Sequence, residues 1–340
     1  MSHLDPYAHV GNGLTQIAVL DDYQHVALKF ADWSAILPRA SVDLFDTTIQ
    51  ISDIDKLVNR LEKYEIIVTM RERTKFPRQL LERLPKLKLL TTTAPKNASI
   101  DVQAASDHGK TVVGTGYHGK GTAEHTWALL LATVRGLAHE HVNTVNGAPS
   151  WQSVVPTSLR EKKLGIVGLG NLGKLTANFG KAFGMEVQAW SPNLTQERCD
   201  AEGVKFIPTK EELFKTSDVI SIHIVLSSSS VGLIDYSTLS LMKPTAFLIN
   251  TSRGPLIKEA DLIRAIKEGI FAGVGLDVFD TEPLPLDHEL RALAKDRRVT
   301  LTPHVGYVDE NLYSIFWGDT VDNINAYLDG NRGALKVIRN

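Results

Sequence analysis

Short apolar runs recur through the first third of the chain, and segments of mixed polarity separate them. The runs with strand character are residues 17–20, 41–45, 65–68, 87–90 and 111–113. Segments with helical spacing, such as 54–63 and 79–84, lie between these runs. Strands that alternate with helices form a mostly parallel sheet with helices on both faces, so this pattern predicts an α/β domain.

A second alternating series begins at residue 164. Its predicted strands are 164–168, 186–190, 219–225, 246–250, 273–278 and 299–302. A strongly apolar helix, 122–139, precedes the series, and its richness in apolar residues suggests burial. The series is long enough for a complete second sheet, so the sequence predicts two doubly wound parallel-sheet domains.

The last amphipathic segment, 310–328, predicts one helix that returns to the first domain. The second sheet would then be an insertion in the first domain. We therefore expect residues 1–118 and 308–340 to form a substrate-binding domain and residues 119–307 to form a dinucleotide-binding domain.

The pattern G-x-G-x-x-G follows the first strand of the second series, at Gly168, Gly170 and Gly173. A helix-compatible segment, 174–183, comes next. In this context Gly168 permits a tight turn from strand to helix, and Gly170 lets the backbone approach a pyrophosphate. Gly173 lets the helix pack close to the strand, so that its N-terminal amides face the phosphates. The segment predicts a Rossmann domain.

Three further motifs each follow a predicted strand. They are N-T-S-R-G at 250–254, L-D-V-F-D-T-E-P at 276–283 and T-P-H-V-G at 302–306. Because the carboxyl ends of parallel strands share one edge, Arg253, Glu282 and His304 can converge near a nicotinamide. A histidine can protonate a carbonyl that accepts hydride, a carboxylate can orient that histidine, and a guanidinium can hold a substrate carboxylate. We expect these three residues to be catalytic.

The order of these motifs resembles that of the D-isomer-specific 2-hydroxyacid dehydrogenases, a family that includes glyoxylate and hydroxypyruvate reductases. The resemblance covers almost the whole chain, including G-T-A-E-H-T at 121–126. It implies a Rossmann coenzyme domain inserted into a flavodoxin-like substrate domain. It also implies hydride transfer between a nicotinamide cofactor and a small 2-oxo or 2-hydroxy acid. By this resemblance Arg253 orients the substrate, His304 is the acid/base, Glu282 pairs with His304, and homodimers form through the coenzyme domain.

The expected cofactor contacts come from the glycine motif and from the loops after the later strands. They are Gly168, Gly170, Asn171, Leu172, Gly173, Ser191, Pro192, Asn193, Ile224, Val225, Ser230, Thr251, Ser252, Arg253, Asp277, His304 and Gly306.

The identity of residue 191 bears on the choice of cofactor. NAD-using Rossmann domains place an acid at this position, where it binds the ribose hydroxyls. This chain has Ser191, followed by Asn193 and Thr195, whose side chains can donate hydrogen bonds to a 2′-phosphate, and Arg198 lies a few residues further on. An acid would repel that phosphate, so the sequence favours NADP(H) and leaves NAD(H) as the alternative.

The segment 91–101 aligns with a loop whose amides receive the substrate carboxylate in the family and which usually carries two glycines. Here Ala94 and Lys96 stand at the glycine positions, and Pro95 between them has no N–H to donate. We expect Pro95 and Lys96 to lie at the substrate, with Lys96 restoring charge complementarity beside Arg253. Arg71 is a further candidate for substrate binding, and a structural salt bridge is its alternative role.

Composition excludes several other classes of partner. The chain has 37 Lys and Arg against 39 Asp and Glu, without a basic stripe, so we expect no nucleic-acid partner. No apolar run is long enough to span a membrane, and residues 1–6 lack a secretory signal pattern. A single cysteine, Cys199, fits a reducing compartment, so the expected location is the cytoplasm. No residues have metal-ligand spacing, and we expect no metal.

Two alternative functions remain on the same fold. One is formate or phosphite oxidation, but formate dehydrogenases of this superfamily carry glutamine where Glu282 stands. The other is a dinucleotide-sensing corepressor or scaffold, which can keep all three catalytic residues. Turnover of a panel of 2-oxo acids distinguishes these alternatives from a reductase.

Overall fold

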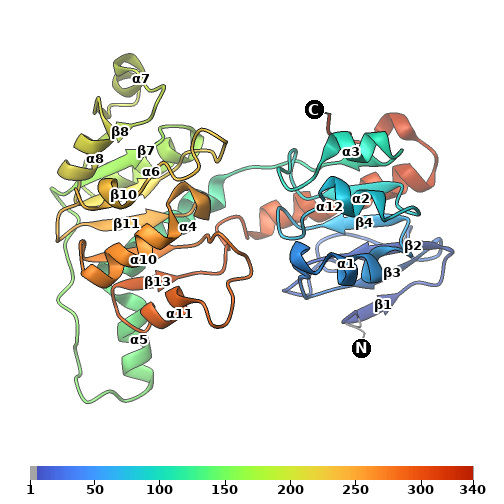
Figure 1. Cartoon of the computed structure of the whole chain (residues 1–340), viewed down its shortest axis with the longest axis horizontal. Helices are drawn as coiled ribbons and strands as arrows, with labels where there is room; N and C mark the ends of the chain where they lie inside the picture. Colours follow the sequence, from blue (N-terminus) through green and yellow to red (C-terminus); the bar gives the residue numbers. More distant parts are fainter. Residues whose placement is uncertain (1–5, 340) are drawn as a thin grey trace. The chain divides into compact units, whose positions relative to one another are not determined.

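In the computed structural model, which describes residues 6–339, the chain forms two sheets, each within its own unit (Figure 1). The first unit contains the described residues through His118 together with those from Asp309 onward, and the second is Gly119–Val308. The sequence placed residue 308 in the first unit, whereas Val308 groups with the second. Residues 1–5 lie outside the described residues. They make up most of the stretch 1–6, for which the sequence analysis found no secretory signal pattern.

The first sheet has the strand order of a flavodoxin-like fold. Its strands are β1 (Ala8–Val10), β2 (Thr15–Val19), β3 (Ala40–Leu44), β4 (Ile66–Thr69), β5 (Leu89–Thr92) and β6 (Thr111–Val113). They lie in the order β1-β3-β2-β4-β5-β6, and all pairs are parallel except β1 with β3. Without β1, this is the order 2-1-3-4-5 of flavodoxin. The sequence did not predict β1, because three partly exposed residues at an edge leave no alternating pattern.

Helices on this unit are short except for the last. They are α1 (Ile54–Leu61), α2 (Arg78–Glu82), α3 (Val102–Asp107) and α12 (Glu310–Leu328), with 3-10 turns at Ile51–Asp53 and Arg332–Ala334. The prediction of a single helix at 310–328 that returns to the first domain is confirmed, since α12 has these bounds and contacts β5. Its N-cap is Asp309, whose carboxylate accepts from the Leu312 amide, as expected for a stable helix start.

The second sheet is wholly parallel and has the Rossmann order. Its strands are β7 (Lys163–Val167), β8 (Glu186–Trp190), β9 (Lys205–Phe206), β10 (Val219–Ile222), β11 (Phe247–Asn250), β12 (Gly273–Leu276) and β13 (Val299–Leu301). They lie in the order β13-β12-β11-β10-β7-β8-β9, which is the order 3-2-1-4-5-6 with one strand added at the end. Both β10 and β12 end earlier than predicted, so residues 223–225 and 277–278 belong to loops at the carboxyl edge.

The second unit has two helices where the sequence analysis predicted one. Its helices are α4 (Lys120–Arg135), α5 (Leu137–Val145), α6 (Asn171–Ala182), α7 (Gln196–Ala201), α8 (Lys210–Thr216), α9 (Tyr236–Leu239), α10 (Glu259–Glu268) and α11 (Glu289–Leu293), with a 3-10 turn at Gly254–Leu256. The predicted helix 122–139 is two helices, because Gly136 adopts a φ of 63° and ends α4 with a left-handed cap.

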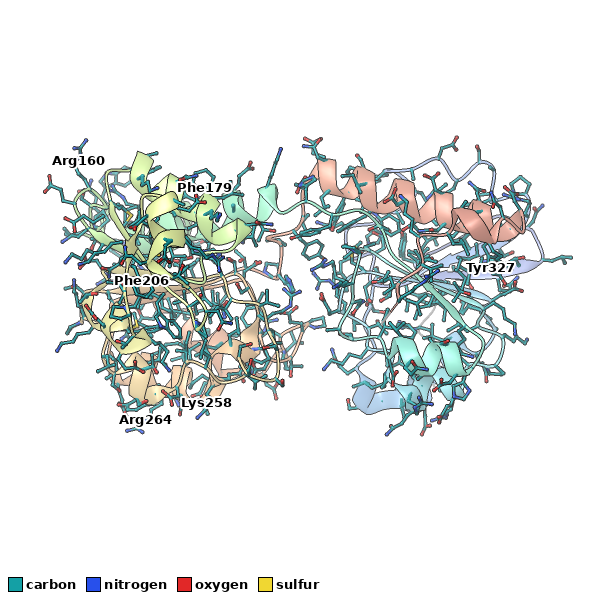
Figure 2. The ribbon with its side chains drawn as sticks, turned by 90° about the horizontal axis from the view of Figure 1, so that it is seen from above. Arg160, Phe179, Phe206, Lys258, Arg264 and Tyr327 are labelled. Atoms are coloured by element: carbon teal, nitrogen blue, oxygen red, sulfur yellow. The ribbon has the colours of Figure 1, made fainter. Side chains whose placement is uncertain are left out.

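Each unit has its own apolar core. In the first, Leu57, Leu80 and Leu90 belong to one buried cluster, and in the second Ile220, Leu248 and Val274 belong to another. Figure 2 shows charged side chains such as Lys258 and Arg264 at the outside of the second unit. None of the helices within residues 6–339 combines the length and the apolar character that a membrane crossing requires.

Candidate active site

The glycine motif has the geometry of a tight turn from strand to helix. Gly168 has a φ of 100°, and a Cβ there would lie 2.9 Å from the carbonyl carbon of His223. A Cβ on Gly173 would lie 2.1 Å from the oxygen of Gly168, so only glycine allows helix α6 to pack this close to the turn. A Cβ on Gly170 would meet no atom of the described residues within 4 Å. The backbone at Gly170 therefore faces open space at the start of α6, where amides can bind phosphate.

Helix α6 begins at Asn171, three residues before the predicted start, so Asn171 and Leu172 form its first turn. The other expected cofactor contacts follow β8, β10 and β11. Ser230 closes the loop after β10, since its hydroxyl accepts from the Ser227 amide at 2.7 Å and donates to the Val225 carbonyl at 2.9 Å. All these segments lie at the carboxyl edge of one parallel sheet, where ligands of such sheets bind.

The loop between β8 and α7, residues 191–195, contains no acid. Ser191 is half-buried directly after the strand, and Pro192 and Asn193 are exposed. The hydroxyl of Thr195 already caps α7 by accepting from the Arg198 amide, so it is less available to a ligand than the sequence suggested. The Arg198 side chain is exposed on α7.

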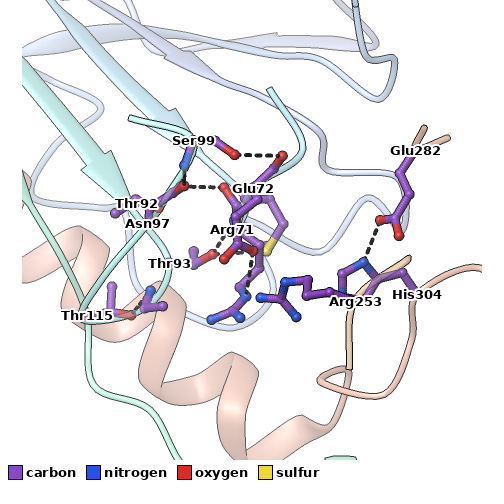
Figure 3. A network of polar contacts seen from close by, with 12 residues as sticks. Arg71, Glu72, Thr92, Thr93, Asn97, Ser99, Thr115, Arg253, Glu282 and His304 are labelled. Atoms are coloured by element: carbon purple, nitrogen blue, oxygen red, sulfur yellow. Dashed lines mark hydrogen bonds and ion pairs between the residues drawn. The ribbon is translucent and has the colours of Figure 1, made fainter. Parts of the chain in front are cut away.

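His304 and Glu282 form a direct pair within the second unit (Figure 3). The distance from His304 Nδ1 to Glu282 Oε2 is 2.5 Å, and the other oxygen of Glu282 accepts from the Phe279 amide at 2.9 Å. The carboxylate is therefore held by the backbone and in turn orients the imidazole. With Nδ1 bonded to Glu282, proton transfer to a substrate would use Nε2.

Arg253 lies in the loop after β11, at the start of the 3-10 turn Gly254–Leu256 (Figure 3). Its carbonyl accepts from the Asn250 side chain at 2.9 Å, and its guanidinium donates to the Ser252 carbonyl at 2.7 Å. These contacts fix the backbone from which the guanidinium extends. The two loops after β11 and β13 thus carry a guanidinium and an imidazole at the same sheet edge.

Asp277 is fully buried and holds the loop that carries His304. Its carboxylate accepts from Thr302 Oγ1 at 2.6 Å and from the amides of Val305 and Gly306, both at 2.9 Å. Burial raises the pKa of this carboxyl, but hydrogen bonds from His125 and Thr302 outweigh burial, and the pKa is lowered overall. The sequence placed Asp277 and Gly306 at the cofactor. Their contact with a cofactor stays a prediction. The sequence analysis did not predict the hydrogen bond from the Gly306 amide to the Asp277 carboxylate.

His223 is a neutral part of the wall beside the glycine turn. Its amide donates to the Val167 carbonyl at 2.8 Å, and its Nε2 lies 2.9 Å from Ser221 Oγ. Burial lowers the pKa of His223 to about 4, so the ring is uncharged near neutral pH. Its position explains why residue 168 must be glycine.

In the first unit, the loop after β5 has a strained start. Ala94 has a φ of 135°, a conformation that favours glycine, and its amide donates to Thr115 Oγ1 at 2.9 Å. Pro95 and Lys96 are exposed within this unit. The Ala94 amide is bonded to Thr115 and is not available to a substrate, and Pro95 has no amide hydrogen. The start of this loop therefore offers few amide donors, as the sequence predicts.

Arg71 is held in a left-handed conformation, with a φ of 53° (Figure 3). Asn97 donates to its carbonyl at 2.6 Å, and Thr93 Oγ1 accepts from its amide at 2.9 Å. The guanidinium lies 5.3 Å from the centre of the Tyr117 ring, and its Nε is 3.6 Å from Glu72. The ion pair that the sequence left as an alternative role for Arg71 is thus present, and substrate binding by Arg71 stays a prediction.

Sequence reasoning missed the contacts of two residues in these loops and helices. Asn97 lies inside the predicted substrate loop but gave no signal of its own, and His125 was assigned no role. Among residues 6–339, no cluster of three or more His, Cys, Asp or Glu is arranged to hold a metal ion.

Comparison with known proteins identifies the family to which this chain is similar. The sequence model of the D-isomer specific 2-hydroxyacid dehydrogenase, NAD binding domain matches residues 127–306. A glyoxylate reductase of Thermococcus litoralis is 35% identical over 258 residues, which cover 74% of this chain and 76% of that protein.

Two solved structures extend the similarity to nearly the full length. A phosphoglycerate oxidoreductase from Vibrio cholerae o395 has a TM-score of 0.86 and 30% identity, over 93% of this chain and 100% of that one. A D-lactate dehydrogenase from Aquifex aeolicus, complexed with NAD and lactic acid, has a TM-score of 0.73 and 29% identity, over 94% and 97% of the two chains. Because the family match alone spans more than half of the sequence, the chain belongs to the D-isomer specific 2-hydroxyacid dehydrogenase family and is an oxidoreductase of CH–OH groups.

Proposed function

We propose that this protein reduces small 2-oxo acids with NADPH as the favoured cofactor. The observation that carries the proposal is the His304–Glu282 pair at the carboxyl edge of a Rossmann sheet. A bound nicotinamide supplies the hydride. His304 gives its Nε2 proton to the carbonyl oxygen, Glu282 stabilises the imidazolium before that transfer, and Arg253 holds the substrate carboxylate.

The preference for NADPH rests on the loop after β8. Ser191 stands where an acid would bind the ribose hydroxyls, and it leaves the position of the 2′-phosphate without a repelling charge. Asn193 is exposed beside it and can donate to the phosphate, and Arg198 is exposed on α7. NADH is the alternative cofactor for this pocket.

The proposed substrate is a 2-oxo acid of the size of glyoxylate or hydroxypyruvate. Glyoxylate reductases are among the relatives at 35% and 37% identity, and a hydroxypyruvate reductase is 28% identical over 93% of this chain. Because Pro95 offers no amide and the Ala94 amide is bonded to Thr115, we propose that cationic side chains bind the substrate carboxylate. Arg253 is the main one, and Lys96 and Arg71 are additional candidates.

We further propose that a second copy of this chain covers the surface of α5 and the segment after it. Helix α5 buries none of its residues, and Val145, Trp151 and Val155 are 70%, 80% and 97% exposed. Beside this segment lies a groove whose lining includes Val134, Val154 and Phe271 together with Arg297 and Arg298. Apolar surface of this extent is typical of an interface between subunits, and a homodimer would bury it twice by symmetry. The cytoplasm is the proposed location.

Turnover of a substrate panel tests the function. Glyoxylate, hydroxypyruvate, pyruvate and longer 2-oxo acids are each offered with NADPH and with NADH, and formate and phosphite are offered with the oxidised cofactors. We expect reduction of at least one 2-oxo acid, faster with NADPH. Cofactor binding without any turnover would instead favour the dinucleotide-sensing role, and oxidation of formate or phosphite alone would favour that branch.

A further inference from the structure

One turn of helix α4 contacts the three strand ends that carry the catalytic side chains. Thr126 Oγ1 lies 2.6 Å from Thr251 Oγ1 in the loop after β11. The next residue back, His125, places its Nε2 3.2 Å from Asp277 Oδ1 after β12 and 3.1 Å from Thr302 Oγ1 after β13. The side chains of this helical turn thus connect segments that are far apart in the sequence.

Asp277 is the centre of this connection. Its carboxylate is inaccessible to water, so it needs hydrogen-bond donors to offset the loss of hydration. Two of those donors are the amides of Val305 and Gly306, the residues directly after His304. Among its donors in the described residues, His125 has the one side chain that can carry a positive charge. Loss of His125 would leave a buried carboxylate under-compensated beside the catalytic loop.

We propose that His125 is a positioning residue for the proton donor. It donates from Nε2 to Asp277, and Asp277 in turn holds the Val305 and Gly306 amides and so fixes the backbone that carries His304. His304 itself has a φ of 53°, a conformation that the surrounding contacts must maintain. The kinetic part of this proposal rests on the proposed function, and the structural part does not.

The test compares His125→Leu, which removes the donor, with His125→Gln, whose amide nitrogen can occupy the place of Nε2. In His125→Leu we expect hydrogen exchange of the Val305 and Gly306 amides to quicken at least tenfold. We expect kcat for the 2-oxo acid to fall about tenfold to a hundredfold, while the NADPH dissociation constant changes by a smaller factor. In His125→Gln, the amide exchange rates and kcat should both return most of the way to their wild-type values.

His288→Leu is the matched control. Its Nε2 lies 3.1 Å from Glu259 Oε1, and its side chain is 17% exposed, against 20% for His125. This substitution removes a similar histidine–carboxylate pair from the same unit, outside the segment 302–306 that carries His304. It should lower the melting temperature without altering kcat or the exchange of the two amides.

Three results would overturn the proposal. The first is unchanged amide exchange in His125→Leu, and the second is faster exchange in that variant with kcat retained. The third is an equal rise in amide exchange and an equal fall in kcat in the His288→Leu control. Failure of His125→Gln to recover either readout would reject the donor role. If the wild-type protein reduces no 2-oxo acid, the proposed function is wrong. Amide exchange still decides whether His125 holds the loop in that case.

Discussion

The chemistry of single residues depends on hydrogen bonds that fix their orientation. In the proposed reaction His304 is the proton donor, and its ring is oriented because Glu282 binds its Nδ1 and the Phe279 amide holds Glu282. Each of these residue types was recognisable in its motif. The bonds among them could be expected because β12 and β13 end at one edge of a parallel sheet.

Ser191→Asp tests the cofactor preference. A carboxylate at this position would repel the 2′-phosphate and could bind the ribose hydroxyls. We expect the NADPH dissociation constant to rise at least tenfold and the NADH constant to stay the same or fall. Fluorescence titration with both cofactors measures this change. Equal affinity of the wild-type protein for both cofactors would already reject the preference.

His223 predicts how stability depends on pH. Burial lowers its folded-state pKa to about 4, whereas an unfolded histidine titrates near 6.5. The unfolded chain therefore takes up the proton first, so this part of the stability is complete above about pH 6.5 and is lost toward pH 4. We expect the free energy of unfolding to fall by about 2 kcal/mol from pH 7 to pH 5 through this residue.

Urea unfolding of His223→Gln at both pH values provides the check. Glutamine can keep the hydrogen bond to Ser221 but does not titrate, so the variant should lose less stability on acidification than the wild type. An identical loss in both proteins would show that His223 does not titrate in this range.

At the scale of secondary-structure elements, the long periodic segments were predictable and the short ones were not. The bounds of α12 and of β8 follow from their sequence pattern, whereas β9 has two residues and β1 three, too few to show a period. The break between α4 and α5 depends on the φ of Gly136. A glycine within an apolar helical pattern does not by itself predict a helix cap. His125 was missed because its partner Asp277 comes from a distant element.

Helix α5 and the following segment predict the oligomeric state. Trp151→Glu places a charge on the proposed interface and should convert a dimer to a monomer, as measured by sedimentation at micromolar concentration. Leu14→Glu is the matched control, because Leu14 is 97% exposed and lies in the other unit. A wild-type protein that is already monomeric, or a Trp151→Glu protein that stays dimeric, would contradict the proposed interface.

At the scale of the whole molecule, the chain crosses between the two units at Gly119 and again at Asp309. The cores are separate, so a ligand that binds the second unit stabilises that unit directly. We expect NADPH at a hundredfold excess over its dissociation constant to stabilise the second unit by about 2.7 kcal/mol. Hydrogen exchange should then slow in β7, β8 and α6, and slowing confined to β2–β5 would contradict the assignment of the cofactor unit.

The central claim is that His304 is the proton donor of a 2-oxo acid reductase. The most direct test is the steady-state rate of His304→Ala with NADPH and the best substrate of the panel, beside its NADPH dissociation constant. We expect kcat to fall by about two to four orders of magnitude, because a general acid is lost, and cofactor affinity to stay within about twofold. A variant that reduces the substrate at nearly the wild-type rate would contradict the account.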